Sequence, residues 1–242
     1  MRIRVIDLET TGFVPETAGV CEIGWCDLEG QRDLAGGYTN WEVFGGQATL
    51  IDPGCGIPPE TSAIHHIIDE DVIGKQKWPD GASSAFSIPF MRADIFAAHN
   101  AKFEKQWCTD NLTDGRPWIC TYKASLRLWP DSPSHSNQCL RYWRKPDGLS
   151  RYEADRSHRA YPDAYVTAFL LRDMLNDGAS IDDLVRWTEE PALQIRCHIG
   201  KNRGLLWSEV DIGFLYWLLD KDFDEDVIFT AKHHIKLREE NL

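Results

Sequence analysis

MRIRVIDLETTG, residues 1–12, is the most informative segment of this 242-residue chain for its fold. Residues 2–5 alternate between arginine and a β-branched residue, and this two-residue period indicates a β-strand. Asp7 and Glu9 stand two residues apart at the end of that strand, so we expect their side chains on the same face. Two neighbouring carboxylates can share divalent cations. The alternative is that the strand has already ended and both acids are solvated.

The rest of the sequence predicts an α/β fold. Residues 20–27 and 38–50 are rich in β-branched and aromatic residues between glycine turns, which predicts a three-stranded meander with the first strand. Residues 94–98 form an apolar run typical of a buried strand, and residues 118–122 are a further strand candidate. Helices are predicted to start after Asn100 and to cover residues 136–144, 163–175 and 181–190.

A second acidic position follows the predicted buried strand, in HNAKFE at residues 99–104. A strand that runs into a helix here places Glu104 near the ends of neighbouring strands, where open α/β sheets carry their sites. Asn100 is a candidate helix cap, and His99 is expected to be a hydrogen-bonded core residue. The alternative for Glu104 is a position on the helix surface.

The third candidate stretch is HRAYPD, residues 158–163. Pro162 is predicted to be the first residue of a helix, where its missing amide hydrogen costs nothing, and to favour an extended Tyr161. Asp163 then lies in the first turn of the helix, and His158 lies on the preceding loop. A histidine on a loop suits proton transfer, because its unperturbed pKa is near neutrality.

These three stretches resemble the DnaQ-like 3′–5′ exonucleases of the subtype called DEDDh. DLETTG, residues 7–12, matches the first motif closely, HNAKFE resembles the family's HNxxFD, and HRAYPD has the histidine-to-aspartate spacing of this subtype. The resemblance covers roughly residues 1–175. Glu104 departs from the pattern, because the family usually has aspartate there. Its longer side chain leaves open whether it binds a metal directly or through water.

The resemblance implies a ribonuclease H-like mixed five-stranded sheet flanked by helices, and a metal-dependent nuclease. We expect Asp7, Glu9 and Asp163 to hold one Mg²⁺ or Mn²⁺ ion, and Asp7 and Glu104 to position a second. His158 is expected to remove a proton from the attacking water. Ligands that are all carboxylates favour these hard ions over zinc.

The resemblance also implies contacts with the terminal nucleotide. The residues expected to make them are Leu8, Thr10, Thr11, Ile64, His65, His66 and Asn100. Core packing accounts equally well for Leu8, and a lone histidine is more often structural than ligand-binding. These contacts are therefore the least specific part of the predicted site.

The charge distribution bears on the substrate. The chain has a formal net charge of −12, which argues against a protein that coats nucleic acid through bulk electrostatics. Residues 116–160, however, contain nine Lys or Arg against four Asp or Glu, with Tyr and Trp between them. Such a segment is expected either to guide a nucleic-acid strand to the acidic site or to be an ordinary solvated face.

Residues 191–242 form a distinct tail after the predicted exonuclease domain of residues 1–178. The tail resembles the C-terminal region of exodeoxyribonuclease X and its relatives, and this favours DNA over RNA as the substrate. GKNRG, residues 200–204, offers glycines and two cations to a phosphate, but it is also an ordinary exposed loop.

The sequence thus predicts a 3′–5′ exodeoxyribonuclease that acts on single-stranded DNA or frayed 3′ ends of duplex DNA, in DNA repair or degradation. The alternatives are an exoribonuclease on the same scaffold and a non-catalytic subunit that binds 3′ ends beside a polymerase. Family members are often dimers, so a homodimer or a repair-protein partner is expected. Seven scattered cysteines and no membrane-spanning stretch favour the cytoplasm.

Overall fold

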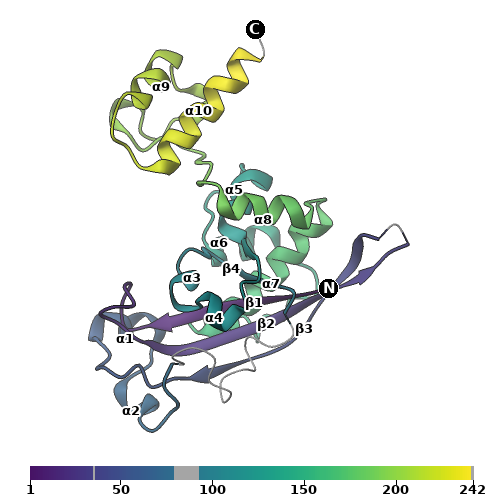
Figure 1. Cartoon of the computed structure of the whole chain (residues 1–242), viewed down its shortest axis with the longest axis vertical. Helices are drawn as coiled ribbons and strands as arrows, with labels where there is room; N and C mark the ends of the chain where they lie inside the picture. The colour runs from purple at the N-terminus through teal and green to yellow at the C-terminus, as the bar shows by residue number, and fades with distance from the viewer. Residues whose placement is uncertain (35, 79–92, 241–242) are drawn as a thin grey trace.

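The computed structural model describes residues 1–34, 36–78 and 93–240, and its centre is a five-stranded mixed sheet (Figure 1). The strand order is β3-β2-β1-β4-β5; β1, β2 and β3 form an antiparallel meander, and β4 and β5 run parallel to β1. The predicted meander and the ribonuclease H-like mixed sheet are therefore confirmed. The strands are β1 (Arg2–Thr10), β2 (Val20–Arg32), β3 (Tyr38–Leu50), β4 (Ile95–Ala98) and β5 (Trp118–Cys120).

Ten α-helices lie in the described part of the chain, and none of them is long and apolar enough to cross a membrane. Five are found in the first 130 residues: α1 (Pro59–His65), α2 (Asp69–Val72), α3 (Glu104–Trp107), α4 (Asp110–Thr113) and α5 (Thr121–Leu128). The other five are α6 (Asn137–Arg144), α7 (Ala160–Asn176), α8 (Ile181–Glu189), α9 (Ile212–Leu219) and α10 (Glu225–Glu239). Two short 3₁₀ turns, η2 (Gly200–Asn202) and η3 (Trp207–Glu209), precede α9.

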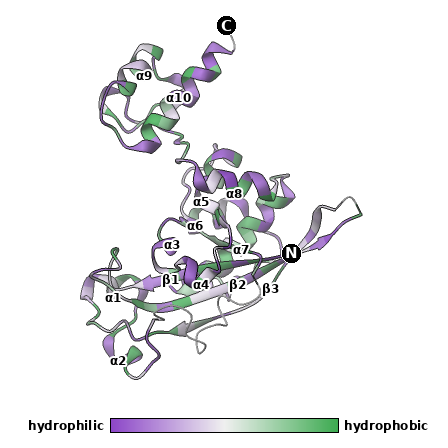
Figure 2. Cartoon of the chain, in the orientation of Figure 1, coloured by the Kyte–Doolittle hydropathy of each residue, from purple (hydrophilic) through white to green (hydrophobic). Residues whose placement is uncertain are grey.

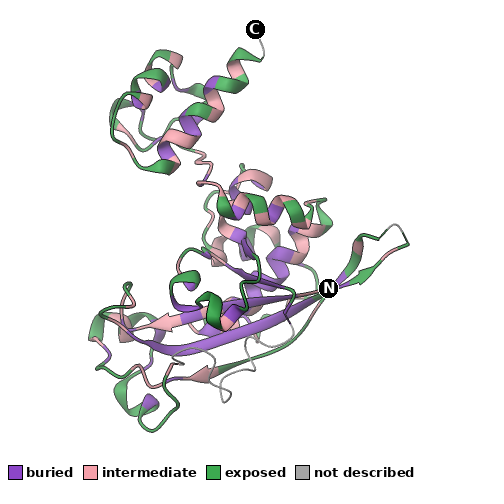
Figure 3. Ribbon diagram, in the orientation of Figure 1, coloured by how far each residue is buried: buried purple, intermediate pink, exposed green. Residues whose placement is uncertain are grey.

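The sheet separates two hydrophobic clusters, and α7 covers one of its faces. Ile3 and Val5 point from β1 into the cluster that includes the α7 residues Ala164 and Leu171. Alternate β1 residues such as Ile6 belong to the cluster on the opposite face. Because successive strand side chains alternate between faces, the position of α7 also fixes which face receives the acids at the end of β1. Figure 3 shows the buried centre of the sheet and the exposed edge at β3.

Gly24 of β2 allows the first turn of α7 to approach the sheet. A Cβ atom at Gly24 would lie 2.2 Å from the carbonyl carbon of Ala160 and 2.2 Å from the backbone nitrogen of Tyr161. Gly24 is also the β2 partner of Asp7 in the antiparallel pair. Only a residue without a side chain permits this contact between a helix and the sheet beside the candidate site.

Two predicted boundaries are wrong. The helix expected at Asp163 begins at Ala160, so Pro162 is its third residue and Tyr161 is helical rather than extended. The first four amide hydrogens of a helix have no intrahelical partner, so a proline costs little anywhere in this turn. Tyr122, expected in a strand, lies in α5.

Asn100 does not cap a helix at Ala101. It has a φ of 80°, in the left-handed region, and α3 begins only at Glu104. Asparagine tolerates this conformation better than most residues do, and here it turns the chain out of β4. The backbone amide of Phe103 donates to the carbonyl oxygen of Asn100 at 2.9 Å.

The C-terminal helices have a hydrophobic cluster of their own. It includes Trp207, Leu215, Leu218 and Val227, and hydrophobic and hydrophilic residues alternate along α10 (Figure 2). Helices α9 and α10 lie apart from the sheet and follow a thin connecting segment (Figure 1). Helix α8, by contrast, packs against the sheet at β5, where the Thr188 hydroxyl oxygen accepts a hydrogen bond from the Cys120 amide at 2.7 Å.

We predict that Gly24→Ala destabilises the protein by about 3 kcal/mol, because the new methyl group meets backbone atoms that cannot rotate away. Gly56→Ala is the matched control: its Cβ would find the nearest atom, Asp69 Oδ2, only at 3.9 Å. Urea unfolding followed by tryptophan fluorescence measures both variants. Equal unfolding free energies for the two variants would contradict the close approach of α7.

Candidate active site

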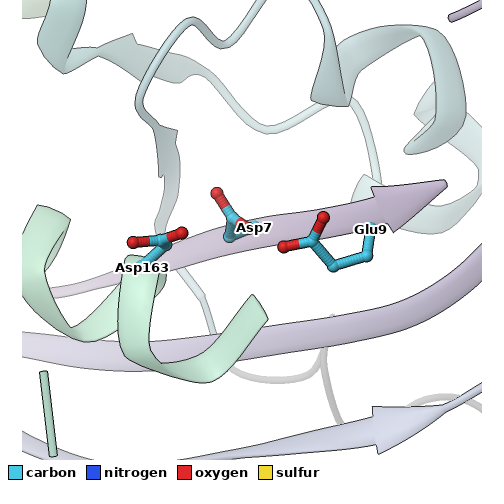
Figure 4. Close-up of side chains that lie close together, drawn as sticks. All are labelled: Asp7, Glu9 and Asp163. Carbon is cyan, nitrogen blue, oxygen red and sulfur yellow. The ribbon is translucent and has the colours of Figure 1, made fainter. Parts of the chain in front are cut away.

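Three carboxylates meet above the end of β1 (Figure 4). Asp7 and Glu9 point from β1 to the same side, and Asp163 reaches them from the first turn of α7. One carboxylate oxygen of each residue lies within 4.8 Å of one from each of the other two. The structure thus brings together three of the four predicted metal ligands on the predicted face of the strand.

Glu104, the fourth predicted ligand, opens α3 and is buried, with 3% of its surface exposed. Its Oε2 atom has no hydrogen-bond partner among the residues that the structure describes. It lies outside the group of three within 4.8 Å, yet its charge is close enough to raise the pKa of Asp7. A buried oxygen without a partner is costly, and a cation at this position would remove the cost.

The four acids disfavour their own charged forms. Burial, followed by the charges of Asp163 and Glu9, raises the pKa of Asp7 well above its usual range. Burial is also the main cause that raises the pKa of Glu9 to about 8 and that of Glu104 to about 8. Burial raises the pKa of Asp163 as well. Such a cluster suits a bound divalent cation, whose charge favours the carboxylate forms.

His158, the predicted base, lies on the loop before α7 and is exposed. Its backbone amide donates to Asp163 Oδ2 at 2.7 Å, so the histidine and the carboxylate are tied together through the main chain. The residue has a φ of 60°, a left-handed conformation that histidine adopts uncommonly. The loop therefore holds His158 beside Asp163.

Several residues of this region were not predicted. Gln138 of α6 donates from Nε2 to Asp163 Oδ1 at 2.8 Å, and Asn137 donates to the Asp163 carbonyl oxygen at 3.3 Å. Glu22 of β2 accepts the amide of Ala160 at 2.9 Å. An acid inside the otherwise apolar run VCEIGWC was a signal for Glu22. Nothing in the sequence of α6 distinguishes Gln138 from a surface residue.

The predicted substrate contacts divide into buried and exposed residues. Leu8 and Thr11 are 5% and 7% exposed, and the hydroxyl oxygen of Thr11 accepts the Gly19 amide at 2.9 Å. His65 is buried, and its Nδ1 accepts the amide of Ile67 at 3.1 Å. These three side chains hold the local structure together.

The remaining predicted contacts are more accessible. Ile64, His66 and Asn100 are exposed, and Thr10 is half-buried. His66 lines a hollow of about 460 Å³ together with residues 155–157 and Arg159, which precede α7. The exposed residues therefore lie where a nucleotide could reach them, and their contacts stay a prediction.

Some of the cationic side chains in residues 116–160 are buried or paired with acids. Arg141 is buried, and it donates to the Ala154 carbonyl oxygen at 2.6 Å. Arg144 pairs with Asp177 at 3.0 Å. Among the aromatic residues of the segment, Tyr152 is 86% exposed, whereas Trp129 is 4% exposed. Fewer basic and aromatic side chains are therefore exposed to a nucleic-acid strand than the sequence predicted.

Comparison with known proteins agrees with this arrangement. The sequence model of the exonuclease family matches residues 5–171, so the chain belongs to the exonuclease family. Exodeoxyribonuclease 10 of Escherichia coli K12 is 30% identical over 246 aligned residues, covering 97% of this chain and 99% of that protein. The DNA polymerase III subunit epsilon of Treponema pallidum is 29% identical over 179 residues, which cover 70% of this chain and 74% of the subunit.

Solved structures give the same result. A structure of exonuclease X in complex with 5′ overhanging duplex DNA aligns with a TM-score of 0.58 and 28% identity, over 77% of this chain and 99% of that one. A full-length 3′-exonuclease shares the fold, with a TM-score of 0.52 over 74% of this chain and 62% of its own. The predicted family and the predicted nuclease class are confirmed, and family membership implies dependence on divalent metal ions.

In EDTA, the raised pKa values predict that folding stability falls as the pH rises from about 4.5 to about 8. Below this window Glu9 and Glu104 are protonated in both the folded and the unfolded chain. Within it the unfolded chain releases these protons while the folded protein retains them, so the free energy of unfolding decreases with pH.

Urea unfolding of the wild type and of Glu9→Gln across this pH range tests the prediction. The variant is expected to gain stability relative to the wild type as the pH rises, because it has no proton to lose at this position. The comparison cancels groups that titrate elsewhere. A stability difference that does not change with pH would contradict the raised pKa of Glu9.

Proposed function

We propose that this chain is a 3′–5′ exodeoxyribonuclease, which hydrolyses the terminal phosphodiester bond of DNA and releases nucleoside monophosphates in DNA repair or degradation. The observation that carries the proposal is the convergence of Asp7, Glu9 and Asp163 within 4.8 Å at the end of β1, in a chain of the exonuclease family. A phosphodiester is negatively charged, so bare carboxylates would repel it. Divalent cations bound to these three carboxylates would neutralise them and let the phosphodiester approach.

The similarity to exodeoxyribonuclease 10 supports DNA as the substrate. The alignment covers 97% of the chain, so it extends into the C-terminal helices, well beyond the catalytic motifs. The structural relative was solved with duplex DNA that has a 5′ overhang, which leaves a recessed 3′ end. We propose single-stranded DNA and frayed 3′ ends of duplex DNA as the substrates of this chain.

Two Mg²⁺ or Mn²⁺ ions are the proposed cofactors. Asp7, Glu9 and Asp163 would hold one of them, and Asp7 with Glu104 the other. The donors are all carboxylate oxygens, which hard cations prefer, and the unpartnered Oε2 of Glu104 fits this role. When bound, such a pair of ions activates water and offsets the charge on the phosphate and on the leaving oxygen.

The residues around the carboxylates have separate proposed tasks. Gln138 and the His158 amide orient the two oxygens of Asp163, and the same bonds lower its pKa and partly counteract burial. The imidazole of His158 accepts the proton of the attacking water at a ring nitrogen. The exposed residues Asn100 and His66 are proposed to contact the terminal nucleotide.

We also propose that the chain works as two parts: an exonuclease domain that includes α8 and a C-terminal unit of residues 191–242. The separate hydrophobic cluster around Trp207 supports this division. All seven cysteines are free, which fits the proposed cytoplasmic location. A homodimer or a repair protein is the proposed protein partner.

The test uses a 5′-labelled DNA oligonucleotide, single-stranded or recessed in a duplex, with Mg²⁺, Mn²⁺ or EDTA. We expect a ladder that shortens from the 3′ end only when metal is present. Asp7→Asn should reduce the rate at least about 1,000-fold, since metal ions contribute several kcal/mol of transition-state stabilisation. His158→Ala should reduce it by about 100-fold or more.

Glu42→Gln is the control, because this exposed acid lies on β3, away from the carboxylates. A matched RNA oligonucleotide separates the proposal from an exoribonuclease, which would degrade RNA faster than DNA. Binding of a 3′ end without a metal-dependent product would indicate a non-catalytic subunit. Normal Mg²⁺-dependent cleavage by Asp7→Asn would show that the assigned site is wrong.

A further inference from the structure

Glu22 is a buried acid that has no part in the catalytic roles proposed above. It lies on β2 directly opposite Glu9 of β1, and its side chain is 2% exposed. A third negative charge beside Glu9 and Asp163 has a cost, because it contributes to the raised pKa of Glu9. The structure must therefore compensate this charge locally.

Within the described residues, the hydrogen bonds that Glu22 accepts come from the start of α7. Arg159 donates from Nε to Glu22 Oε2 at 2.9 Å, and its Nη2 donates to Oε1. The backbone amide of Ala160 also donates to Oε2 at 2.9 Å. Oε1 thus accepts from Arg159, and Oε2 accepts from Arg159 and Ala160. Glu22 is occupied as a structural acceptor rather than free to hold a cation.

Arg159 connects this ion pair to the proposed base. It follows His158 directly and is the residue before the first turn of α7. On the other side, the His158 amide is bound to Asp163 Oδ2 at 2.7 Å. His158 is therefore held between two anchors, one on Asp163 and one on Glu22, and its uncommon φ of 60° is maintained between them.

We infer that the Glu22–Arg159 pair is a positioning device, which fixes His158 relative to Asp163 for the nuclease reaction. This inference rests on the proposed function. The two residues act on His158 through the backbone of the loop.

The chemistry of the pair suits this task better than a contribution to stability. A guanidinium group presents a planar fork that matches a carboxylate in one orientation, so it fixes direction as well as distance. A buried ion pair, in contrast, is weak as a source of net stability, because desolvation of both charges offsets their attraction. The orientation of the loop is what the protein gains.

The test is a double-mutant cycle on the metal-loaded, full-length protein with a single-stranded DNA substrate. Arg159→Ala should lower kcat by about 10- to 100-fold with KM within about twofold, the size of loss expected from a small misplacement of a reacting group. In a His158→Ala background the same change should cost less than about twofold, because no base remains to be positioned. Millimolar guanidinium should restore part of the activity of Arg159→Ala.

Arg172→Ala is the matched control. Arg172 lies on α7 and pairs with Asp173 at 3.2 Å, but it is far along the helix from the carboxylates. It should leave kcat unchanged and gain nothing from guanidinium. If Arg159→Ala does not fold, Arg159→Lys and Glu22→Gln replace it. A smaller loss of kcat is expected from each, because Arg159→Lys keeps a donor to Glu22 and Glu22→Gln keeps an acceptor for the Ala160 amide.

Two results would overturn the inference. One is a wild-type kcat in the folded variants, and the other is an equal loss of kcat in the wild-type and His158→Ala backgrounds, which would indicate a merely structural role. The failure of the proposed function looks different. A wild-type chain without metal-dependent cleavage would remove the proposed function and the inference together.

Discussion

The close approach of α7 to Gly24 is the constraint on which the rest of the site depends. Without a side chain at Gly24, the backbone of Ala160 and Tyr161 rests directly on β2. Glu22, two residues earlier on the same strand, accepts the first amide of the helix. This contact brings Asp163 from α7 into the reach of Asp7 on the neighbouring strand. A small displacement of the helix would separate carboxylates that are far apart in sequence.

The same geometry brings mutually repelling carboxylates together. Four acids, one buried and three half-buried, have raised pKa values, with about 8 for Glu9 and about 8 for Glu104. Such a cluster lowers stability at neutral pH, and cations that bind there would recover the cost. The protein offsets the neighbouring charge of Glu22 differently, with an arginine from its own chain. Glu22 is therefore neutralised by an arginine of the chain, whereas the neutralisation of its neighbour Glu9 is left to the proposed cations.

The predicted family, fold type and site roles came from the resemblance of the motifs to a known family. The predicted strands came from the periodicity of the sequence. The alternation of residues 2–5 and the apolar run of residues 94–98 predicted the strands of the sheet. The positions of Tyr122 and Tyr161 were assigned wrongly, because β-branched neighbours and a proline are local signals. The strand end at Cys120 and the helix start at Ala160 are set instead by hydrogen bonds that their amides donate to Thr188 and Glu22. These partners are distant in sequence.

The chemical class of the site can be inferred from short segments of the chain. The acids of DLETTG, the histidine-to-aspartate spacing of HRAYPD and the strand pattern around them are local features, and local features can be read from one segment. The groups that hold these residues in place became apparent from the fold alone. Gln138 bonds to Asp163 and Arg159 bonds to Glu22 across 25 and 137 residues of sequence. Such pairings depend on how α6, α7 and β2 pack, and no periodicity within a single segment encodes that packing.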